Sequence, residues 1–258
     1  MIDIHCHPLP YLDDGAADWD TALEMARMAC GDGITQCITT PHWTGVPGET
    51  EKAASTRAEF SERLASAGLS LRLHPGNEVV LVPKLGEALS QQRALTLGGS
   101  SYVLLETAQL EQGAYIHSAL FQLQSQGYRI ILAHPERVRA WQHDTADLQQ
   151  LVVRGCYLQV NAGSLHGFFG KSAQKAAEGF LKQRWVSFLA TDAHSTRSRP
   201  PLISEALKRC ARLIGEEAAM ALVTTNPARV LCDELVPAVD PDGAAPRKRS
   251  WLPWLNRG

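Results

Sequence analysis

The sequence predicts an α/β protein whose strands run parallel, arranged either as a barrel or as a doubly wound sheet. Seven short β-rich runs alternate with longer amphipathic stretches, and strands that alternate with helices pair in parallel through right-handed crossovers. Several of the amphipathic stretches end at glycine, the residue that commonly follows a helix. The 258 residues suffice for one large α/β domain or two small ones.

The first predicted strand, IDIHCH at residues 2–7, has a polar row on one face and an apolar row on the other, because strand side chains alternate. The polar row is Asp3, His5 and His7, and the apolar row is Ile4 and Cys6. A polar row is unusual in a buried strand unless it holds a ligand.

The remaining elements follow in a regular order. The other predicted strands are the apolar runs at 35–40, 71–76, 101–106, 128–133, 156–161 and 186–191. The predicted helices are the amphipathic stretches at 18–33, 49–68, 113–127, 145–155 and 172–184. Beyond the last strand, the pattern predicts two or three helices that reach about Leu235, and Asn226-Pro227 marks the start of the last one.

The composition changes again near residue 237. We expect one domain over residues 1–236 and a flexible tail over residues 237–258, because Pro, Gly, Ala and Asp are frequent there. The tail ends in RKRSWLPWL, which is basic and contains two tryptophans. Such an end is typical either of a disordered tail or of a segment that contacts a membrane surface or a partner.

The overall composition is that of a water-soluble enzyme. Hydrophobic residues make up 45% of the chain and charged residues 20%, and the formal net charge of −2 does not favour nucleic acid as a partner. No apolar run approaches the roughly 20 residues that cross a bilayer. The six cysteines form no C-x-x-C pair. We therefore expect reduced, buried thiols and a cytoplasmic location.

Polar side chains are concentrated where the predicted strands end. The strand ends read HCH, TPH, GNE, LLE, AHPER, VNAGS and TDAH. In parallel α/β proteins the carboxyl ends of the strands meet on one face, where sites are built. With an acid from the loop after the first strand, this face receives five histidines and four carboxylates: His5, His7, Asp14, His42, Glu78, Glu106, His134, Asp192 and His194.

These nine residues together predict a metal centre. A single histidine at a strand end is usually a hydrogen-bonded structural residue, but that explanation would have to hold independently for most of the strands. Without metal, such a cluster would be poorly solvated and mutually repulsive. Imidazole and carboxylate suit Zn²⁺, Mn²⁺ or Fe²⁺. Nine ligands exceed the need of one ion, so we expect two or three ions with bridging carboxylates.

Two arginines near these residues indicate a phosphate substrate. Arg137 follows His134 in HPER, and either Arg197 or Arg199 follows the TDAH motif. The guanidinium group matches phosphate oxygens in a bidentate manner and keeps its charge. Metal ions lower the pKa of water from near 16 to about 7 and so supply hydroxide at neutral pH. Together these features favour phosphoester hydrolysis over amide hydrolysis.

Other phosphatase and hydrolase chemistries lack their motifs here. No cysteine has an arginine six positions later, as a cysteine-dependent tyrosine phosphatase requires, and neither a P-loop nor a G-x-S-x-G elbow is present. We interpret His74, His117 and His143 as structural or exposed. His166, in AGSLHGFFG, lies near the proposed site and is left open.

The chain resembles the polymerase-and-histidinol-phosphatase (PHP) superfamily in the order of its motifs. These motifs are DIHCHPLPYLDDGA, TPH, GNEV, LLE, LAHPER, VNAGSL and TDAH. Within it, the chain is most similar to the CpsB/CapC-like manganese-dependent protein-tyrosine phosphatases of bacterial capsule and exopolysaccharide operons. Among the families of this superfamily, the DDG, HPER and DAH…RPP motifs favour the tyrosine phosphatases. The resemblance covers residues 3–201, and the helices to about residue 235 fit the family's length.

The resemblance implies a distorted seven-stranded (βα) barrel with a trinuclear metal site at the carboxyl ends of its strands. The nine residues above would be the ligands, with Glu78 bridging two ions, Mn²⁺ as the cofactor and Fe²⁺, Zn²⁺ or Mg²⁺ as alternatives. Arg137 and Arg199 would bind the phosphoryl group. The implied reaction is hydrolysis, by metal-activated hydroxide, of phosphotyrosine on the tail of a membrane-bound tyrosine autokinase that controls polysaccharide synthesis.

Two other functions stay open at this stage. The first is a small-molecule phosphoesterase of the same superfamily, acting on histidinol phosphate or a nucleotide, because loops that set pocket depth decide substrate size. The second is a metal-binding regulator without activity, which the full set of nine positions disfavours. The basic, Trp-containing tail is outside the family's motifs and is a candidate for peripheral contact at the inner membrane.

Overall fold

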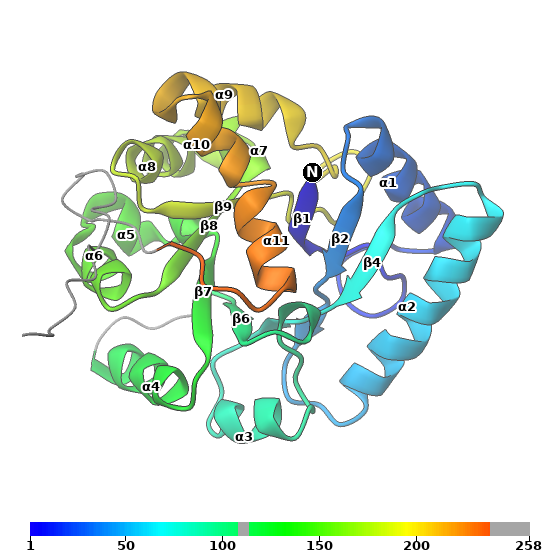
Figure 1. Ribbon diagram of the computed structural model, residues 1–258, viewed down its shortest axis with the longest axis horizontal. Coiled ribbons are helices and arrows are strands. Elements are labelled where there is room, and N and C mark those ends of the chain that lie inside the picture. The colour runs from blue at the N-terminus through cyan, green and yellow to red at the C-terminus, as the bar shows by residue number, and fades with distance from the viewer. Residues whose placement is uncertain (108–113, 238–258) are drawn as a thin grey trace, which may run out of the picture.

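The computed structural model describes residues 1–107 and 114–237, and the strands lie at the centre with helices around them (Figure 1). The tail predicted at 237–258, apart from its first residue, lies outside the described residues, so the membrane-contact hypothesis does too. The strands are β1 (Ile2–Cys6), β2 (Gln36–Thr39), β3 (His42–Trp43), β4 (Arg72–Pro75), β5 (Glu78–Val79), β6 (Tyr102–Leu105), β7 (Arg129–Ala133), β8 (Tyr157–Asn161) and β9 (Val186–Ala190).

Helices connect the successive strands, as the alternating pattern predicts, except between β2 and β3 and between β4 and β5. They are α1 (Trp19–Gly31), α2 (Glu49–Ser66), α3 (Leu85–Ser90), α4 (Ala114–Ser125), α5 (Arg139–His143), α6 (Ala146–Val153), α7 (Ala162–Leu165), α8 (Gly170–Lys182), α9 (Ser204–Ile214), α10 (Glu216–Ala221) and α11 (Thr225–Leu231). The last three confirm the expected C-terminal helices, and α11 contains the Asn226-Pro227 dipeptide. No helix in the described ranges has the length and apolar character needed to span a membrane.

All strand pairs are parallel, which confirms the α/β class, and they form two sheets. One sheet has the order β1-β2-β4 and the other β3-β5-β6-β7-β8-β9. The single seven-stranded barrel is therefore not confirmed by the strand pairing. The end of β1 nevertheless contacts the chain after β9, through a parallel bridge between Cys6 and Ala193 and a hydrogen bond of 2.9 Å from His7 N to the Ala193 carbonyl.

Two sheets arise because two of the predicted strands, at 35–40 and 71–76, are each followed after a short break by a further two-residue strand, which pairs in the other sheet. Thr40-Pro41 separates β2 from β3, and proline has no N–H to continue a ladder. Gly76-Asn77 separates β4 from β5. A Cβ on Gly76 would lie 2.8 Å from the Ile38 side chain, so only glycine fits there. Asn77 joins the two breaks, because its amide nitrogen donates to the Pro41 carbonyl at 3.0 Å.

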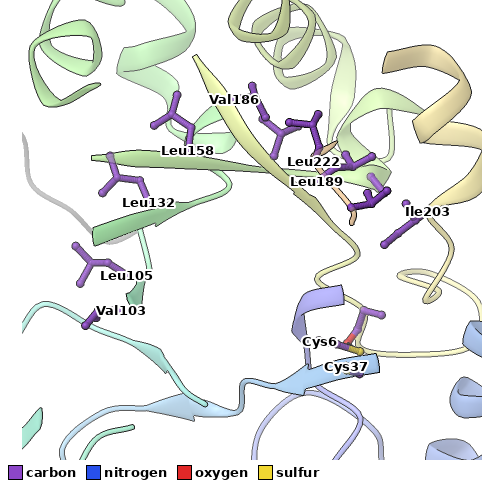
Figure 2. Close-up of a cluster of buried hydrophobic side chains, with 14 of the residues drawn as sticks. Cys6, Cys37, Val103, Leu105, Leu132, Leu158, Val186, Leu189, Ile203 and Leu222 are labelled. Atoms are coloured by element: carbon purple, nitrogen blue, oxygen red, sulfur yellow. The ribbon is translucent and has the colours of Figure 1, made fainter. Parts of the chain in front are cut away.

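Both faces of the strands are buried, which explains why their sequences are nearly continuously apolar. Towards the helices, Leu105, Leu132, Leu158 and Val186 are register partners on neighbouring strands β6 to β9, and they form a row in Figure 2. A second hydrophobic cluster lies on the opposite face and includes Ile4, Leu104, Ile131 and Phe188. The two clusters hold the strands rigidly, so the residues after them have fixed positions.

The strict alternation predicted for residues 2–7 is wrong. The register of β1 against β2 shifts between Asp3 and Cys6, which is the signature of a β-bulge. As a result, Ile4 packs in the second cluster whereas Cys6 packs in the first. Asp3 accepts hydrogen bonds from Thr191, at 2.6 Å from its hydroxyl, and so links β1 to the chain after β9.

Candidate metal centre

The structure brings all nine predicted ligand residues together at the carboxyl ends of the strands. His42 and Glu78 are register partners at the first positions of β3 and β5, so the short strands that follow the predicted ones place them at the site. Four overlapping groups have ligand atoms within 4.8 Å of one another: His7, Asp14, His42 and His194; His5, His134 and Asp192; His5, His7 and Glu78; and His42, Glu78 and Glu106.

Glu78 is the central carboxylate of the cluster. Its Oε1 lies 2.9 Å from His134 Nε2, and its Oε2 lies 3.1 Å from His42 Nδ1 and 3.3 Å from His5 Nε2. The side chain is 1% exposed. Both carboxylate oxygens of Glu78 therefore face imidazole groups of the cluster.

Asp192 is the second buried carboxylate, and it connects the histidines to the arginines. Its Oδ1 lies 3.3 Å from His5 Nε2 and 3.5 Å from His194 Nδ1. Its Oδ2 accepts hydrogen bonds from Asn161 Nδ2 at 2.6 Å and from Arg137 at 3.1 Å. The predicted strand end VNAGS therefore contributes Asn161 as a residue that orients Asp192.

Asp14 closes the cluster on its solvent side. Its Oδ1 lies 3.3 Å from His42 Nε2 and 3.2 Å from His194 Nε2, and its side chain is 65% exposed. The DDG turn requires Gly15, because a Cβ there would lie 2.2 Å from the His7 carbonyl oxygen. The chain can pass close to His7 for this reason and bring Asp14 to the site.

Two of the nine residues have strained backbones. His134 has φ of 36° and Asp192 has φ of 51°, values in the left-handed region that non-glycine residues rarely adopt. Such a conformation costs on the order of 1–3 kcal/mol and persists where the surroundings enforce it, often at functional sites. His134 directly follows the buried strand β7, and Asp192 lies two positions after the end of β9, so the strand ends carry both side chains to the cluster.

The residues fit a set of divalent cations. Among the described residues of the cluster, three buried atoms that face other ligand-type groups have no hydrogen-bond partner: Glu78 Oε2, Asp192 Oδ1 and His194 Nε2. His5 Nε2 and His7 Nε2 face each other at 3.1 Å. Leaving buried polar atoms unpaired is costly, and a cation between them satisfies several at once. Nitrogen and oxygen ligands without thiolate suit Mn²⁺, Fe²⁺ or Zn²⁺.

The charges of the cluster balance one another when no cation is bound. Burial alone would lower the pKa of His134, but the adjacent Glu78 carboxylate raises it to about 9. Burial alone would raise the pKa of Glu78, but the charge of His5 and the hydrogen bond from His134 hold it well below its usual range. Burial and the nearby His7 lower the pKa of His194 to about 3. In the metal-free protein, the proton on His134 therefore compensates part of the negative charge that bound cations would compensate.

Metal binding should therefore release protons. At pH 7 the metal-free protein holds His134 protonated, because its pKa is about 9, whereas an imidazole that binds metal must be neutral. We expect at least about one proton per chain to be released at pH 7, and the affinity for Mn²⁺ to rise as the pH approaches 9. Calorimetry in two buffers of different ionisation enthalpy measures this number. A value of zero would argue against His134 as a ligand.

Sequence reasoning missed Asp13, which orients His7. Asp13 Oδ2 lies 2.7 Å from His7 Nδ1, and it also accepts a hydrogen bond from the His42 backbone N–H at 3.0 Å. Burial alone would raise the pKa of Asp13, but the hydrogen bond from His7 lowers it to about 2. Carboxylates that bind the second ring nitrogen of a ligand histidine are common at metal sites. The available signal was the first acid of the DDG motif, which directly precedes Asp14.

Replacing Asp13 should weaken metal binding without removing a ligand. We expect Asp13→Asn to lower the affinity for Mn²⁺ by about 10- to 100-fold, the usual effect of losing such a partner. Competition against a chelator measures the change. Asp147→Asn is the matched control, because Asp147 pairs with His117 at 2.6 Å outside the cluster. Equal losses in both variants would show that the effect is not specific to His7.

The two predicted arginines lie at the edge of the cluster. Arg199 lies 2.5 Å and Arg137 3.1 Å from Asp192 Oδ2, and both guanidinium groups face the ring of Phe169, at 4.5 Å for Arg137 and 5.8 Å for Arg199. Arg197 is exposed and has no ion pair among the described residues. Of the two alternatives after TDAH, the geometry favours Arg199. Sequence reasoning did not identify Phe169.

The other histidines are outside the cluster. His74 Nε2 lies 2.8 Å from Gln36 Oε1, and His117 pairs with Asp147. His143 is the last residue of α5. His166 lies in the turn between α7 and α8 and lines a cavity next to Arg199.

Fold and site together define a class, the parallel α/β proteins with a candidate metal centre at the carboxyl ends of their strands. Residues 1–232 match the family described as capsular polysaccharide synthesis, CpsB/CapC. The chain belongs to this family.

Proteins of known name and structure support the same assignment. The chain is 34% identical to the tyrosine-protein phosphatase YwqE of Bacillus subtilis, over 84% of this chain and 86% of that protein. It is 29% identical to the tyrosine-protein phosphatase CpsB of Streptococcus pneumoniae, over 92% of this chain and 100% of that protein. A crystal structure from a study of YwqE and CpsB, described as metal-dependent tyrosine phosphatases, superposes with a TM-score of 0.86 at 32% identity, covering 93% of this chain and 98% of the other.

Proposed function

We propose that this chain is a metal-dependent protein-tyrosine phosphatase that acts on a tyrosine kinase in capsule or exopolysaccharide synthesis. The observation that carries the proposal is the convergence of Arg137 and Arg199 on one carboxylate of a nine-residue cluster of metal-ligand type. The family and the named phosphatases to which the chain is similar support the same reaction.

The nine clustered residues would hold two or three divalent cations, with Mn²⁺ as the proposed ion. When bound, such cations supply Lewis acidity and activate water as the nucleophile. Glu78 and Asp192, which each face more than one imidazole, would bridge or share ions. Asp13 and Asn161 keep His7 and Asp192 in position through hydrogen bonds of 2.7 and 2.6 Å.

The arginines would bind the phosphoryl group. Arg137 and Arg199 present N–H donors at the edge of the cluster, where they can stabilise the negative charge that grows on phosphoryl oxygens. Their side chains are 27% and 22% exposed, so substrate can reach them. In the free protein their charges are held by Asp192, and the Phe169 ring supports both guanidinium groups.

The open side of the cluster supports a peptide substrate. Asp14, with its side chain 65% exposed, forms the outer wall, and His42 is 28% exposed. A site that reaches solvent can accept phosphotyrosine on a flexible protein segment. We propose the tail of a membrane-bound tyrosine kinase as that segment and the cytoplasm as the location, which the six free thiols support.

We also propose that the two sheets form one distorted barrel, supported by the Cys6–Ala193 bridge.

Phosphate release from a panel of substrates tests this function. With Mn²⁺ present, we expect a phosphotyrosine peptide to give the highest kcat/KM. Histidinol phosphate and a nucleoside monophosphate should give values at least about tenfold lower, because small substrates leave the open face uncontacted. Faster release from either small molecule would identify a small-molecule phosphoesterase and contradict the proposal.

A further inference from the structure

An apolar cavity adjoins the proposed phosphate site. It has a volume of about 330 Å³, and its apolar wall is formed by Phe168, Phe169, Pro200 and Leu202. Phe168 is 55% exposed and Leu202 is 41% exposed, which is unusual for large apolar side chains in one place. Both residues lie in turns, before α8 and before α9, that are anchored by the fold.

The cavity shares two residues with the phosphate site. Arg199 lines it and also contacts Asp192 at 2.5 Å. Phe169 lines it and stacks against both arginines. A peptide whose phosphate is bound by Arg137 and Arg199 would therefore have its neighbouring residues at the mouth of this cavity, since one residue spans about 3.3–3.6 Å of extended chain.

The cavity extends away from the metal cluster. Its far wall includes Asp32 and Ser204, and Asp32 accepts hydrogen bonds from the backbone N–H groups of Ile203 at 2.6 Å and Ser204 at 2.9 Å at the start of α9. Asp32 lies just after the C-terminal end of α1, whereas the cluster residue Asp14 lies before its N-terminal end. The length of α1 therefore separates this wall of the cavity from Asp14. A phosphotyrosine whose phosphate is held by Arg137 and Arg199 would place its ring at the end of the cavity lined by Arg199 and Phe169, which leaves the end lined by Asp32 and Ser204 for a neighbouring side chain.

Size and the apolar wall select the class of that side chain. A volume of about 330 Å³ is large enough for a bulky side chain, and the apolar wall favours an aliphatic or aromatic one. The polar lining carries both signs of charge, with Asp32 and Glu205 beside Arg199 and His166, so the apolar wall is what selects the side chain. We propose that the cavity is a specificity pocket for one large apolar residue next to phosphotyrosine in the substrate. This assignment rests on the proposed phosphatase function.

The test compares a series of phosphotyrosine peptides with a reference peptide, from which each member of the series differs at one flanking position. One series carries leucine in turn at each of the two positions on either side of phosphotyrosine, and the reference peptide carries serine there. With the full-length, Mn²⁺-loaded protein, we expect leucine at one position to raise kcat/KM by about tenfold, as expected for an apolar side chain entering an apolar pocket. Phe168→Ser and Leu202→Ser should each reduce this ratio towards one.

Two further variants make the outcome specific. Phe168→Leu keeps an apolar wall and should retain the preference for leucine. Phe121→Ser removes another exposed phenylalanine, 68% exposed on α4 and outside the cavity, and should also retain it. A wild-type protein that hydrolyses the reference and every peptide of the series equally, or serine variants that keep the full ratio, would overturn the pocket while leaving the phosphatase function intact. Absence of hydrolysis of every phosphotyrosine peptide would instead overturn the proposed function and the pocket with it.

Discussion

Glu78→Gln is expected to abolish phosphatase activity and to lower the metal content of the purified protein. The substitution keeps the size of the side chain but replaces a carboxylate with an amide that binds divalent cations weakly. Glu78 is the residue closest to the centre of the cluster, within 3.3 Å of His134, His42 and His5. We expect kcat/KM to fall by at least about a thousandfold, the scale of losing a main electrostatic group at a reacting centre.

Elemental analysis and phosphate release from a phosphotyrosine peptide measure the two effects in one preparation. Asp147→Asn serves as a control, because it replaces another acid that pairs with a histidine away from the cluster. It should retain metal and activity. If Glu78→Gln kept full metal content and turnover, Glu78 would have no role as a ligand, and the bridging position assigned to it would be wrong.

Arg199→Ala is expected to keep the metal but lose turnover. Arg199 supplies no metal ligand, and the carboxylate of Asp192 retains its hydrogen bonds from Arg137 and Asn161. If the guanidinium stabilises charge on the transferring phosphoryl group, its loss should lower kcat by about 100-fold or more. Arg199→Lys should recover only part of this loss, because an ammonium group cannot contact two oxygens with a planar fork.

Arg197→Ala is the matched control for this prediction. Arg197 is two positions away on the same loop, but it is exposed and has no ion pair in the described part of the chain. It should behave like the wild type. A large loss in Arg197→Ala with normal turnover in Arg199→Ala would reverse the assignment that the geometry favours. Loss of metal in Arg199→Ala would show that Arg199 acts on the cluster and not on phosphate.

The sequence predicted the fold class well because burial on both faces leaves a strong signal. Each of the apolar runs became a strand, as the row of Leu105, Leu132 and Leu158 illustrates. The short strands β3 and β5 were not predicted, because Pro41 and Gly76 are typical of strand ends and two residues are too few to give a strand pattern. The bulge in β1 was also missed, since a change of register depends on pairing with β2 and leaves no local pattern.

The site was predictable to the extent that its residues follow strand ends. His134 and Asp192 each sit beyond a buried strand, so their meeting follows from parallel topology. Asp13 could not be separated from Asp14, because neighbouring acids in a turn look alike until the path of the loop is known. Phe169 gave no signal either, since an aromatic ring that supports two arginines is recognisable only when all three are in contact.

The most direct test is to measure metal content together with phosphate release from a phosphotyrosine peptide, before and after chelation. We predict two or three divalent ions per chain, complete loss of release when they are removed, and recovery when Mn²⁺ is added back. Phosphate release that continues at the same rate in protein freed of metal would contradict the account, because the clustered histidines and carboxylates would then have no part in the reaction.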